Sequence, residues 1–424
     1  PENDAKVVMR PYLDANVKNL DSNYEETFWE MLQEEGTEDA VALLARTKPN
    51  PFDAPRFTVA AAMSCWADGL EMMDRRLEEG YVEKSYGGMV SAGERVKLEK
   101  YVLVFTDRDW EDNLIITMAL KAASRAREVG YGDLRTEHAQ TWKQRWTSCD
   151  VNVNGDDAAQ QGIRFNLFQL LSTYSGDDAR LNIGPKGFTG EKYGGATYWD
   201  TEAYCLSVYM AVAGQDVARQ LLMYRYLQLD GAYFNAQQQG LKGALYPMVT
   251  FTGIECHNEW EITFEEIHRN GAIAHAIFNY TTYTGDESYI RNEGLDVLCG
   301  IARFYTDAFF ADCAKLNIKT PDVVEPATNC IDEYIHMVQT LLEQGKAYFV
   351  GGNVYFDTST LEKYYVFNDH DEEDLATGVR EGVEEDTNKR NKNDFVLWFT
   401  KSKFEDQALK WDSPWGVGYP GWHI

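Results

Sequence analysis

The pattern of apolar and polar positions divides the chain into a strand-rich beginning and a helix-rich middle. Segments such as RFTVAAAM (56–63) and GGMVSAGERVKLEKYVLVFT (87–106) alternate with a period of two, which predicts antiparallel strands. One earlier segment, NYEETFWEMLQEE (23–35), has instead the composition and spacing of a helix. After this sheet region, the apolar positions within 108–146 predict two further helices.

From Asp156 onward the pattern becomes one helix after another. Apolar positions recur every three to four residues in segments separated by glycine-rich loops, namely 158–174, 201–213, 215–239, 264–285 and 287–305. Paired helices of this length suggest an (α/α)6 barrel, but the pattern supplies about six helices, half of the set that such a barrel needs. We therefore expect an incomplete barrel whose apolar faces lack some of their partners.

Carboxylates, histidines and aromatic rings are concentrated in the stretch Gly243–Ala276. They are Glu255, His257, Glu259, Trp260, Glu261, Phe264, Glu265, Glu266 and His268. Acidic side chains accept hydrogen bonds from vicinal hydroxyls and flat rings cover the C–H faces of a pyranose, so this composition suits a sugar site. Taken as one helix from Glu261, the stretch places Glu265 and His268 on one face. A surface helix with solvated carboxylates explains the same pattern.

A second candidate site is the glycine-rich loop Gly184–Asp200. Its glycines allow the backbone to approach a ligand closely. Trp199, Asp200 and Glu202 then open a helix, where carboxylates are stabilised by the positive end of the helix dipole. A packed tryptophan beside a simple helix cap is the structural alternative.

Composition limits the classes of function. A chain of 424 residues with 44% hydrophobic residues can form two or more domains. The formal charge of −28 argues against a general nucleic-acid-binding surface. The seven cysteines include no C-x-x-C pair, which indicates reduced thiols in a cytoplasmic protein and no zinc site. No apolar run is long enough to span a membrane, and no leader marks secretion. Because the first residue is Pro1, we expect that sequence upstream is missing.

Three stretches together resemble the disaccharide (maltose-type) phosphorylases of glycoside hydrolase family 65. They are Gly184–Tyr204, Leu221–Gly240 and Gly243–Ala276, and YLDANVKNLDSNYEETFW and NPFDAPRFTV extend the likeness toward the beginning of the chain. The resemblance covers residues 1–303. It implies the tail of an N-terminal β-sandwich over 1–107, linker helices over 108–150, and the first half of an (α/α)6 catalytic barrel over 151–303.

The same resemblance assigns roles to individual residues. Trp199 and Asp200 match the pair that holds the non-reducing glucose, and the carboxylate cluster lines the pocket, which gives the substrate-binding set Trp199, Asp200, Glu202, Glu266 and His268. The implied ligand is a disaccharide or glucose, with inorganic phosphate as co-substrate of a homodimeric parent enzyme and no resident cofactor. The sequence does not say whether that disaccharide is maltose, trehalose, kojibiose or nigerose.

The family's reaction is inverting phosphorolysis, in which a carboxylic acid protonates the glycosidic oxygen while phosphate attacks the anomeric carbon. That acid lies in a G-P-x-E-Y motif after a helix ending in A-R-F-W. Here the helix ends at Ala302-Arg303-Phe304-Tyr305, and no G-P-x-E-Y follows. We therefore assign no catalytic residue and predict no phosphorolysis.

Residues 304–424 resemble a different family, the cysteinyl-tRNA synthetases, most specifically in NKNDFVLWFTKSK and WDSPWGVGYPGWHI. The likeness implies a partial α/β Rossmann-like segment of a nucleotide-binding domain. It places Trp422 and His423 in the cysteine region, and Gly416 and Gly418 near the adenylate. Trp411 and Trp415 can equally be packing residues.

The motifs with which this second family binds ATP and zinc, H-I-G-H, K-M-S-K-S and the zinc-ligand set, do not occur in the segment. The segment is also acidic, with 22 Asp and Glu against 11 Lys and Arg, so tRNA binding is not expected. We expect an inactive fusion of two fragments that join near Arg303–Tyr305. Two alternatives stay open, a non-catalytic sugar-binding module and a half-barrel that does not fold.

Overall fold

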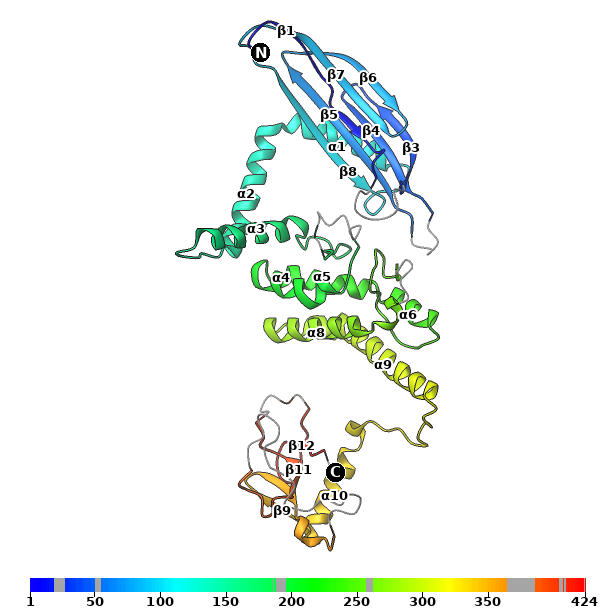
Figure 1. The fold of residues 1–424 in the computed structure, drawn as a ribbon, viewed down its shortest axis with the longest axis vertical. Helices are drawn as coiled ribbons and strands as arrows, with labels where there is room; N and C mark the ends of the chain where they lie inside the picture. Colours follow the sequence, from blue (N-terminus) through cyan, green and yellow to red (C-terminus); the bar gives the residue numbers. More distant parts are fainter. Residues whose placement is uncertain are drawn as a thin grey trace. The chain divides into compact units, whose positions relative to one another are not determined.

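The structure is a computed structural model, and it divides into two compact units, Pro1–Ile318 and Lys319–Ile424. Within them the residues it describes are 1–18, 27–49, 55–185, 187, 196–256, 262–363, 386–403, 407, 409–422 and 424. The first unit contains a sheet domain followed by a helical domain, and the second contains a small sheet and a helix (Figure 1). The chain is therefore a multidomain protein with an N-terminal sheet domain, as the sequence predicts.

The sheet domain is built from two antiparallel sheets. The first has the order β3 (Trp29–Gly36), β4 (Ala40–Thr47), β5 (Thr58–Asp68) and β8 (Lys97–Thr106). In the second, β7 (Tyr81–Val90) pairs with β1 (Ala5–Met9), β2 (Tyr12–Asp14) and β6 (Glu71–Glu78). Buried side chains from both sheets form one cluster, which includes Val41, Met63, Val82 and Tyr86. The strands predicted from RFTVAAAM and GGMVSAGERVKLEKYVLVFT are confirmed.

The helix predicted over residues 23–35 is wrong in its described part. Trp29–Gly36 is a strand that pairs with β4 from Trp29 opposite Thr47 to Gly36 opposite Val41. The local sequence favours a helix, but pairing with a buried neighbouring strand satisfies the same backbone groups and also covers apolar side chains. The remaining residues of that prediction, 23–26, lie outside the described part of the chain.

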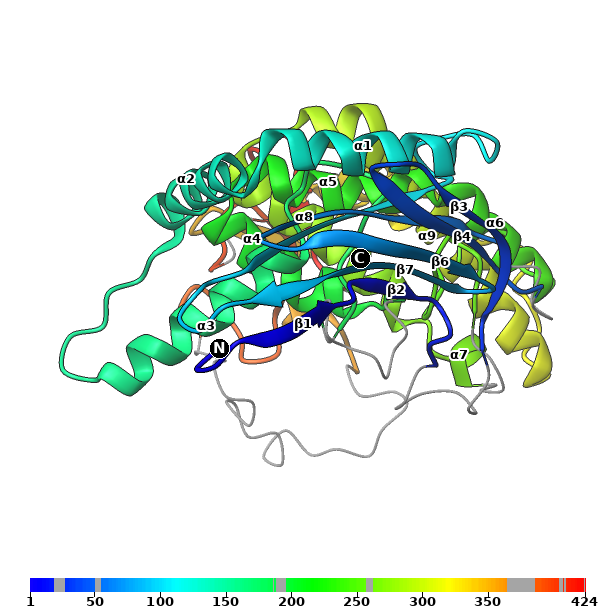
Figure 2. The same cartoon turned by 90° about the horizontal axis from the view of Figure 1, so that it is seen from above.

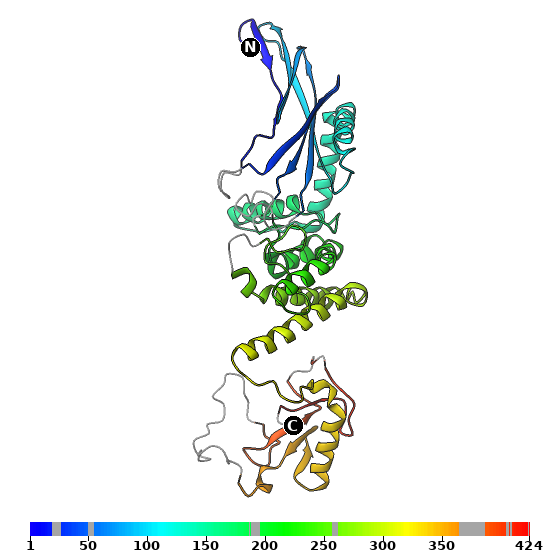
Figure 3. The same cartoon turned by 90° about the vertical axis from the view of Figure 1, so that its right-hand side faces the viewer.

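Helix α1 (Ile115–Val129) covers the outer face of the first sheet (Figures 2 and 3). Its Ile115, Ala119 and Ala123 pack against Ala42 and Ala60 of the strands. Because β4 is covered by α1 on one face and by the second sheet on the other, six consecutive residues, AVALLA, are buried. This segment is therefore packed into the sheet domain as well as linking it to the helices.

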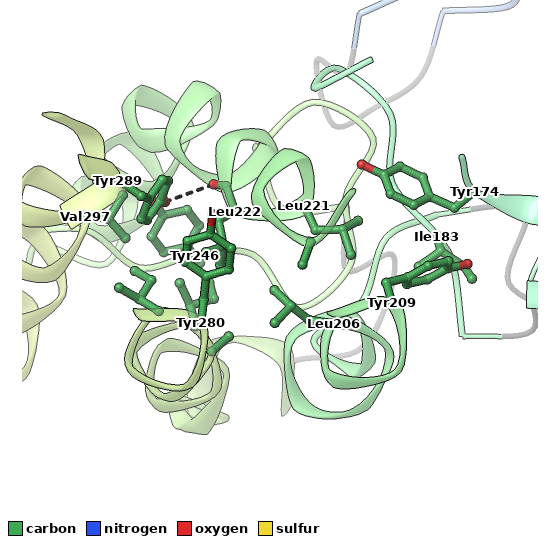
Figure 4. Close-up of a cluster of buried hydrophobic side chains, with 14 of the residues drawn as sticks. Tyr174, Ile183, Leu206, Tyr209, Leu221, Leu222, Tyr246, Tyr280, Tyr289 and Val297 are labelled. Carbon is green, nitrogen blue, oxygen red and sulfur yellow. Dashed lines mark hydrogen bonds between the residues drawn. The ribbon is translucent and has the colours of Figure 1, made fainter. Parts of the chain in front are cut away.

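The helical domain follows as a series of helices and two π turns. They are α2 (Tyr131–Cys149), α3 (Asp157–Thr173), η3 (Thr201–Cys205), α4 (Leu206–Val212), α5 (Gln215–Leu227), α6 (Leu229–Gln238), α7 (Ile262–Glu265), α8 (His268–Thr284), η4 (Ile290–Gly294) and α9 (Leu295–Lys315). Helices α4, α5 and α8 pack against one another, as Figure 1 shows. Tyrosines and leucines fill the space between them (Figure 4), and the hydroxyl of Tyr289 donates a hydrogen bond to the carbonyl of Leu222 at 3.1 Å.

Helix α3 begins with a side-chain cap that gives a first testable prediction. The carboxylate of Asp156 accepts a hydrogen bond from the backbone N–H of Ala159 at 2.9 Å. We expect Asp156→Ala to lower the free energy of unfolding of the first unit by about 1 kcal/mol, because one N–H of the first turn loses its partner. Urea denaturation followed by circular dichroism measures this. Asp157→Ala, which removes an adjacent acidic residue without a cap bond, is the control and should have a smaller effect.

The second unit has one four-stranded sheet and one long helix. Its elements are η5 (Ala327–Asn329), α10 (Ile331–Glu343), β9 (Ala347–Val350), β10 (Asn353–Phe356), η6 (Thr358–Thr360), β11 (Phe395–Phe399) and β12 (Tyr419–Pro420). The sheet order is β12-β11-β10-β9, and every pair is antiparallel. The Rossmann-like expectation is therefore wrong for the described strands, because that fold is built on parallel strands. For β9 and β10 the antiparallel pairing follows from the tight turn at Gly351-Gly352, which returns β10 beside β9 as a hairpin.

The join predicted near Arg303–Tyr305 lies inside a regular helix. Helix α9 runs without interruption from Leu295 to Lys315, and Phe304 is buried in its packing against Ala236 and Leu245. The second compact unit begins only at Lys319. The change in sequence character is thus not accompanied by a break in the backbone.

Candidate functional site

Two helix starts meet at the candidate site. Trp199 lies two residues before the turn η3, whose N-cap residue is Asp200, and His268 is the first residue of α8. Their rings lie edge to face, with centroids 4.8 Å apart and planes at 88°. Tyr204 extends the aromatic group, with its ring 5.8 Å from that of Trp199. The structure therefore brings together two predicted site residues that are far apart in the sequence.

Two predicted carboxylates flank this aromatic pair in the chain. Asp200 follows Trp199, and Glu266 precedes His268 by two positions. Both are half-buried, and neither carboxylate makes a hydrogen bond or ion pair to a residue that the structure describes. An ionised carboxylate is an acceptor only, so each can receive hydrogen bonds from ligand hydroxyls. The site therefore combines the aromatic ring of Trp199 with the hydrogen-bond acceptors of Asp200 and Glu266, which lie close to Trp199 and His268 in the chain.

Glu202 has a different environment from the other predicted residues. Its two carboxylate oxygens accept hydrogen bonds from Nε and Nη2 of Arg225, each at 2.8 Å, and both side chains are buried. Burial alone would lower the pKa of Arg225, but the charge and hydrogen bonds of Glu202 raise it on balance. Nη2 of Arg225 also donates to the carbonyl of Tyr198 at 3.2 Å. Glu202 thus holds an arginine that fixes the backbone next to Trp199.

Glu255 and Arg269 form a second buried ion pair, in which Arg269 is the second residue of α8. Oε2 of Glu255 is 3.5 Å from Nη2 of Arg269, and the Glu255 carboxylate accepts hydrogen bonds from the N–H groups of Met248 at 2.6 Å and Val249 at 3.1 Å. Burial raises the pKa of Glu255, while Arg269 and the backbone donors oppose the rise. Burial also lowers the pKa of Arg269, against the charge of Glu255. The sequence placed Glu255 in the wall of a pocket, whereas the structure places it in the protein interior.

The stretch from Glu261 is not one helix in its described part. Helix α7 ends at Glu265 and α8 begins at His268, with Glu266 and Ile267 between them. The remaining members of the predicted cluster, His257, Glu259, Trp260 and Glu261, lie outside the described residues. So do residues 188–195 of the glycine-rich loop.

Sequence reasoning missed Arg225 and Arg269. Both are fully or almost fully buried. The available signal was an arginine within an apolar run, as in LLMYRYL around Arg225. Such a residue needs a buried partner, because an unpaired charge in the interior is costly.

In the second unit the structure describes three of the four predicted ligand residues, namely Trp422, Gly416 and Gly418. Trp422 is 97% exposed, and His423 lies outside the described residues. Gly418 has a packing reason of its own, since a Cβ there would lie 2.0 Å from the carbonyl oxygen of Phe399. Gly416 has φ +121°, which favours glycine. Trp411 and Trp415 pack against the buried cluster that contains Trp398, as the structural alternative predicts.

The described residues contain neither a metal-binding cluster nor a membrane-spanning helix. No group of three or more His, Cys, Asp or Glu side chains there could hold a metal ion. All seven cysteines are free. No helix among these residues has the length and apolar character needed to cross a bilayer.

Comparison with known families agrees with this geometry. The N-terminal domain of glycosyl hydrolase family 65 matches residues 1–145, and the central catalytic domain of that family matches residues 164–358. The chain therefore belongs to glycosyl hydrolase family 65 over these residues.

Individual relatives refine the assignment. The chain is 52% identical over 304 residues to maltose phosphorylase of Bacillus subtilis, which covers 72% of this chain and 40% of that protein. A solved structure of a putative kojibiose phosphorylase from the human microbiome is similar with a TM-score of 0.65 and 26% identity, over 72% of this chain and 39% of that one. The C-terminal part is 56% identical over 124 residues to cysteine–tRNA ligase of Treponema denticola, covering 29% of this chain and 25% of the ligase. The chain thus spans 40% or less of each of these relatives.

Proposed function

We propose that the helical domain binds the glucosyl unit of a maltose-type disaccharide. The observation that carries the proposal is the edge-to-face pair of Trp199 and His268, with the half-buried carboxylates of Asp200 and Glu266 next to them in the chain. An exposed part of a ring can cover the C–H face of a pyranose while the acceptors bind its hydroxyls. Glu202 acts behind these residues by holding Arg225.

We further propose that α3 to α9 form the first half of an (α/α)6 barrel, within the domain boundaries 1–107, 108–150, 151–303 and 304–424 given by the sequence. The likeness to family 65 and to the solved phosphorylase supports the barrel. The last boundary falls inside the residues that the catalytic-domain comparison matches, and α9 continues through it. The two sequence types therefore share one helix.

In this proposal the chain binds sugar but does not cleave it. Phosphorolysis requires a carboxylic acid that protonates the glycosidic oxygen while phosphate attacks the anomeric carbon. After Ala302-Arg303-Phe304-Tyr305 the sequence has no G-P-x-E-Y, so none of its residues is assigned as that acid. Phosphate-dependent release of glucose 1-phosphate from maltose by the purified protein would contradict this part of the proposal.

The binding role is tested with Asp200→Ala. We expect maltose or glucose to bind the wild-type chain, and the variant to bind about tenfold more weakly or worse, because a hydrogen bond to a charged acceptor contributes about 1.5–3 kcal/mol. Isothermal titration calorimetry measures both affinities. Asp296→Ala is the matched control, since Asp296 is an exposed acid in the first turn of α9. Equal affinities in all three proteins would refute the role of Asp200.

A second candidate function is suggested by the identity of the C-terminal part to cysteine–tRNA ligases. We propose that this part is a ligase-derived segment joined to the phosphorylase-derived one, and that it does not activate cysteine. Its sequence has no H-I-G-H, and its described strands are antiparallel. Cysteine-dependent exchange of pyrophosphate into ATP would show the opposite.

The free cysteines are consistent with a reducing compartment for the whole protein.

A further inference from the structure

A polar network lies in the interior behind the candidate site, and Tyr246 is at its centre. Tyr246 is fully buried; its hydroxyl donates to the carbonyl of Arg225 at 3.0 Å, and its N–H donates to Oδ1 of Asn270 at 2.9 Å. Its own carbonyl accepts a hydrogen bond from Nε of Arg269. Tyr246 therefore connects Arg225, which donates to the backbone next to Trp199, with Arg269, which follows His268 in the chain.

Arg269 fixes the place where α7 ends and α8 begins. Its Nη1 donates to the carbonyl of Thr263 in α7 and, at 2.7 Å, to the carbonyl of Glu266 between the two helices. Its Nη2 faces Glu255 at 3.5 Å. The planar guanidinium thus holds both sides of the helix break and the loop that contains Glu255. The rigid guanidinium of arginine can bind several acceptors in fixed directions, which the single ammonium group of lysine cannot do.

Burial explains why the two charges depend on each other. The side chains of Glu255 and Arg269 are 5% and 2% exposed. Removing either partner would leave an uncompensated charge in the interior, so each side chain is stable in this position only while the other is present. Glu266 and His268 lie three and one residues before Arg269, so they share its placement.

We propose that Glu255 and Arg269 are a positioning pair for the sugar site, which sets the start of α8 so that His268 meets Trp199 and Glu266 faces the ligand. That the ligand is a sugar rests on the function proposed above. The placement of His268 against Trp199 does not depend on that function. The pair itself has no contact with sugar. Supporting residues of this kind determine whether a preformed site is accurate enough to bind.

Two variants of the full chain separate positioning from simple stabilisation. Arg269→Lys keeps a cation opposite Glu255 but loses the fork. The double variant Glu255→Leu and Arg269→Met replaces both charges by apolar groups of similar size and so leaves no unpaired buried charge; circular dichroism and urea denaturation establish that it folds. Arg291→Lys is the matched control, because Arg291 forms an exposed pair with Glu287 at 2.5 Å near the start of α9.

The direct readout is the NMR signal of His268 Cε1–H, which the ring current of Trp199 shifts. Trp199→Leu gives the position of the signal without that ring. We expect both variants to keep their helical circular dichroism and to move the His268 signal toward the Trp199→Leu position, while Arg291→Lys leaves it unchanged. Maltose affinity should fall about tenfold or more in both variants.

Unchanged His268 signals and unchanged maltose affinity in the two variants would overturn the proposal. If the wild-type chain does not bind maltose, the proposed function fails, but the His268 signal still decides the positioning role. The two failures are therefore distinguishable.

Discussion

Replacing Arg225 by methionine is expected to lower the free energy of unfolding of the helical domain by about 3–5 kcal/mol. The variant leaves the Glu202 carboxylate buried without the two donors that hold it at 2.8 Å. It also removes the donor to the carbonyl of Tyr198. Methionine fills similar space, so the loss reports the unpaired charge rather than a cavity.

Urea denaturation followed by circular dichroism at a helical wavelength measures this loss. Arg291→Met is the control, because its partner Glu287 is exposed and surface pairs contribute about 0–1 kcal/mol. A loss below about 1 kcal/mol for Arg225→Met would mean that Glu202 finds another partner. We also expect weaker sugar binding from this variant, since Trp199 follows the backbone that Arg225 holds.

The sheet domain shows what a hydrophobic pattern can predict. The strands β5, β7 and β8 lie where the sequence alternates apolar and polar residues. The strand Trp29–Gly36 was missed because its local propensity is helical and only its pairing with β4 makes it a strand. Long-range pairing of this kind is not encoded in a short window.

The candidate site was predictable in part. The resemblance to family 65 selected Trp199, Asp200, Glu266 and His268, and the structure places the rings of Trp199 and His268 in contact. The roles of Glu202 and Glu255 were not predictable from their residue type, because a carboxylate serves equally well as a ligand or as the partner of a buried arginine. That choice depends on three-dimensional burial.

The break between α7 and α8 illustrates the same point. The sequence FEEIHRNG has no glycine or proline at the break, so its period reads as one helix. The break is stabilised by Arg269, which reaches back to the carbonyls of Thr263 and Glu266. In the second unit, similarly, family likeness suggested a parallel sheet, while the described strands are antiparallel and the turn at Gly351-Gly352 makes β9 and β10 a hairpin.

The second unit depends strongly on one carboxylate, Asp394, which is 1% exposed. It accepts hydrogen bonds from the hydroxyl of Tyr348 at 2.7 Å, from N and Oγ1 of Thr358 at 2.8 Å each, and from N of Asn391 at 2.9 Å. We expect Asp394→Ala to lower the free energy of unfolding of this unit by about 3–5 kcal/mol, because several buried donors lose their acceptor together.

Hydrogen exchange with mass spectrometry can localise this effect to peptides that cover β10 and β11. Asp412→Ala, at an exposed aspartate of the same unit, should leave their protection unchanged. Asp394→Asn keeps one acceptor oxygen and should fall between the two. Equal protection in wild type and Asp394→Ala would show that the donors are satisfied in another way.

The same carboxylate predicts how stability depends on pH. Burial alone would raise the pKa of Asp394, but the hydrogen bonds from Thr358, Tyr348 and Asn391 outweigh it and lower the pKa from 3.8 to about 2. Because the pKa is lower in the folded state, the contribution is complete above the unfolded value and is lost as the pH falls through the folded one; its size is about 2 kcal/mol. Urea titrations at pH 5 and pH 2 should therefore differ more in the wild type than in Asp394→Asn. An equal difference in both proteins would assign the acid sensitivity to other carboxylates.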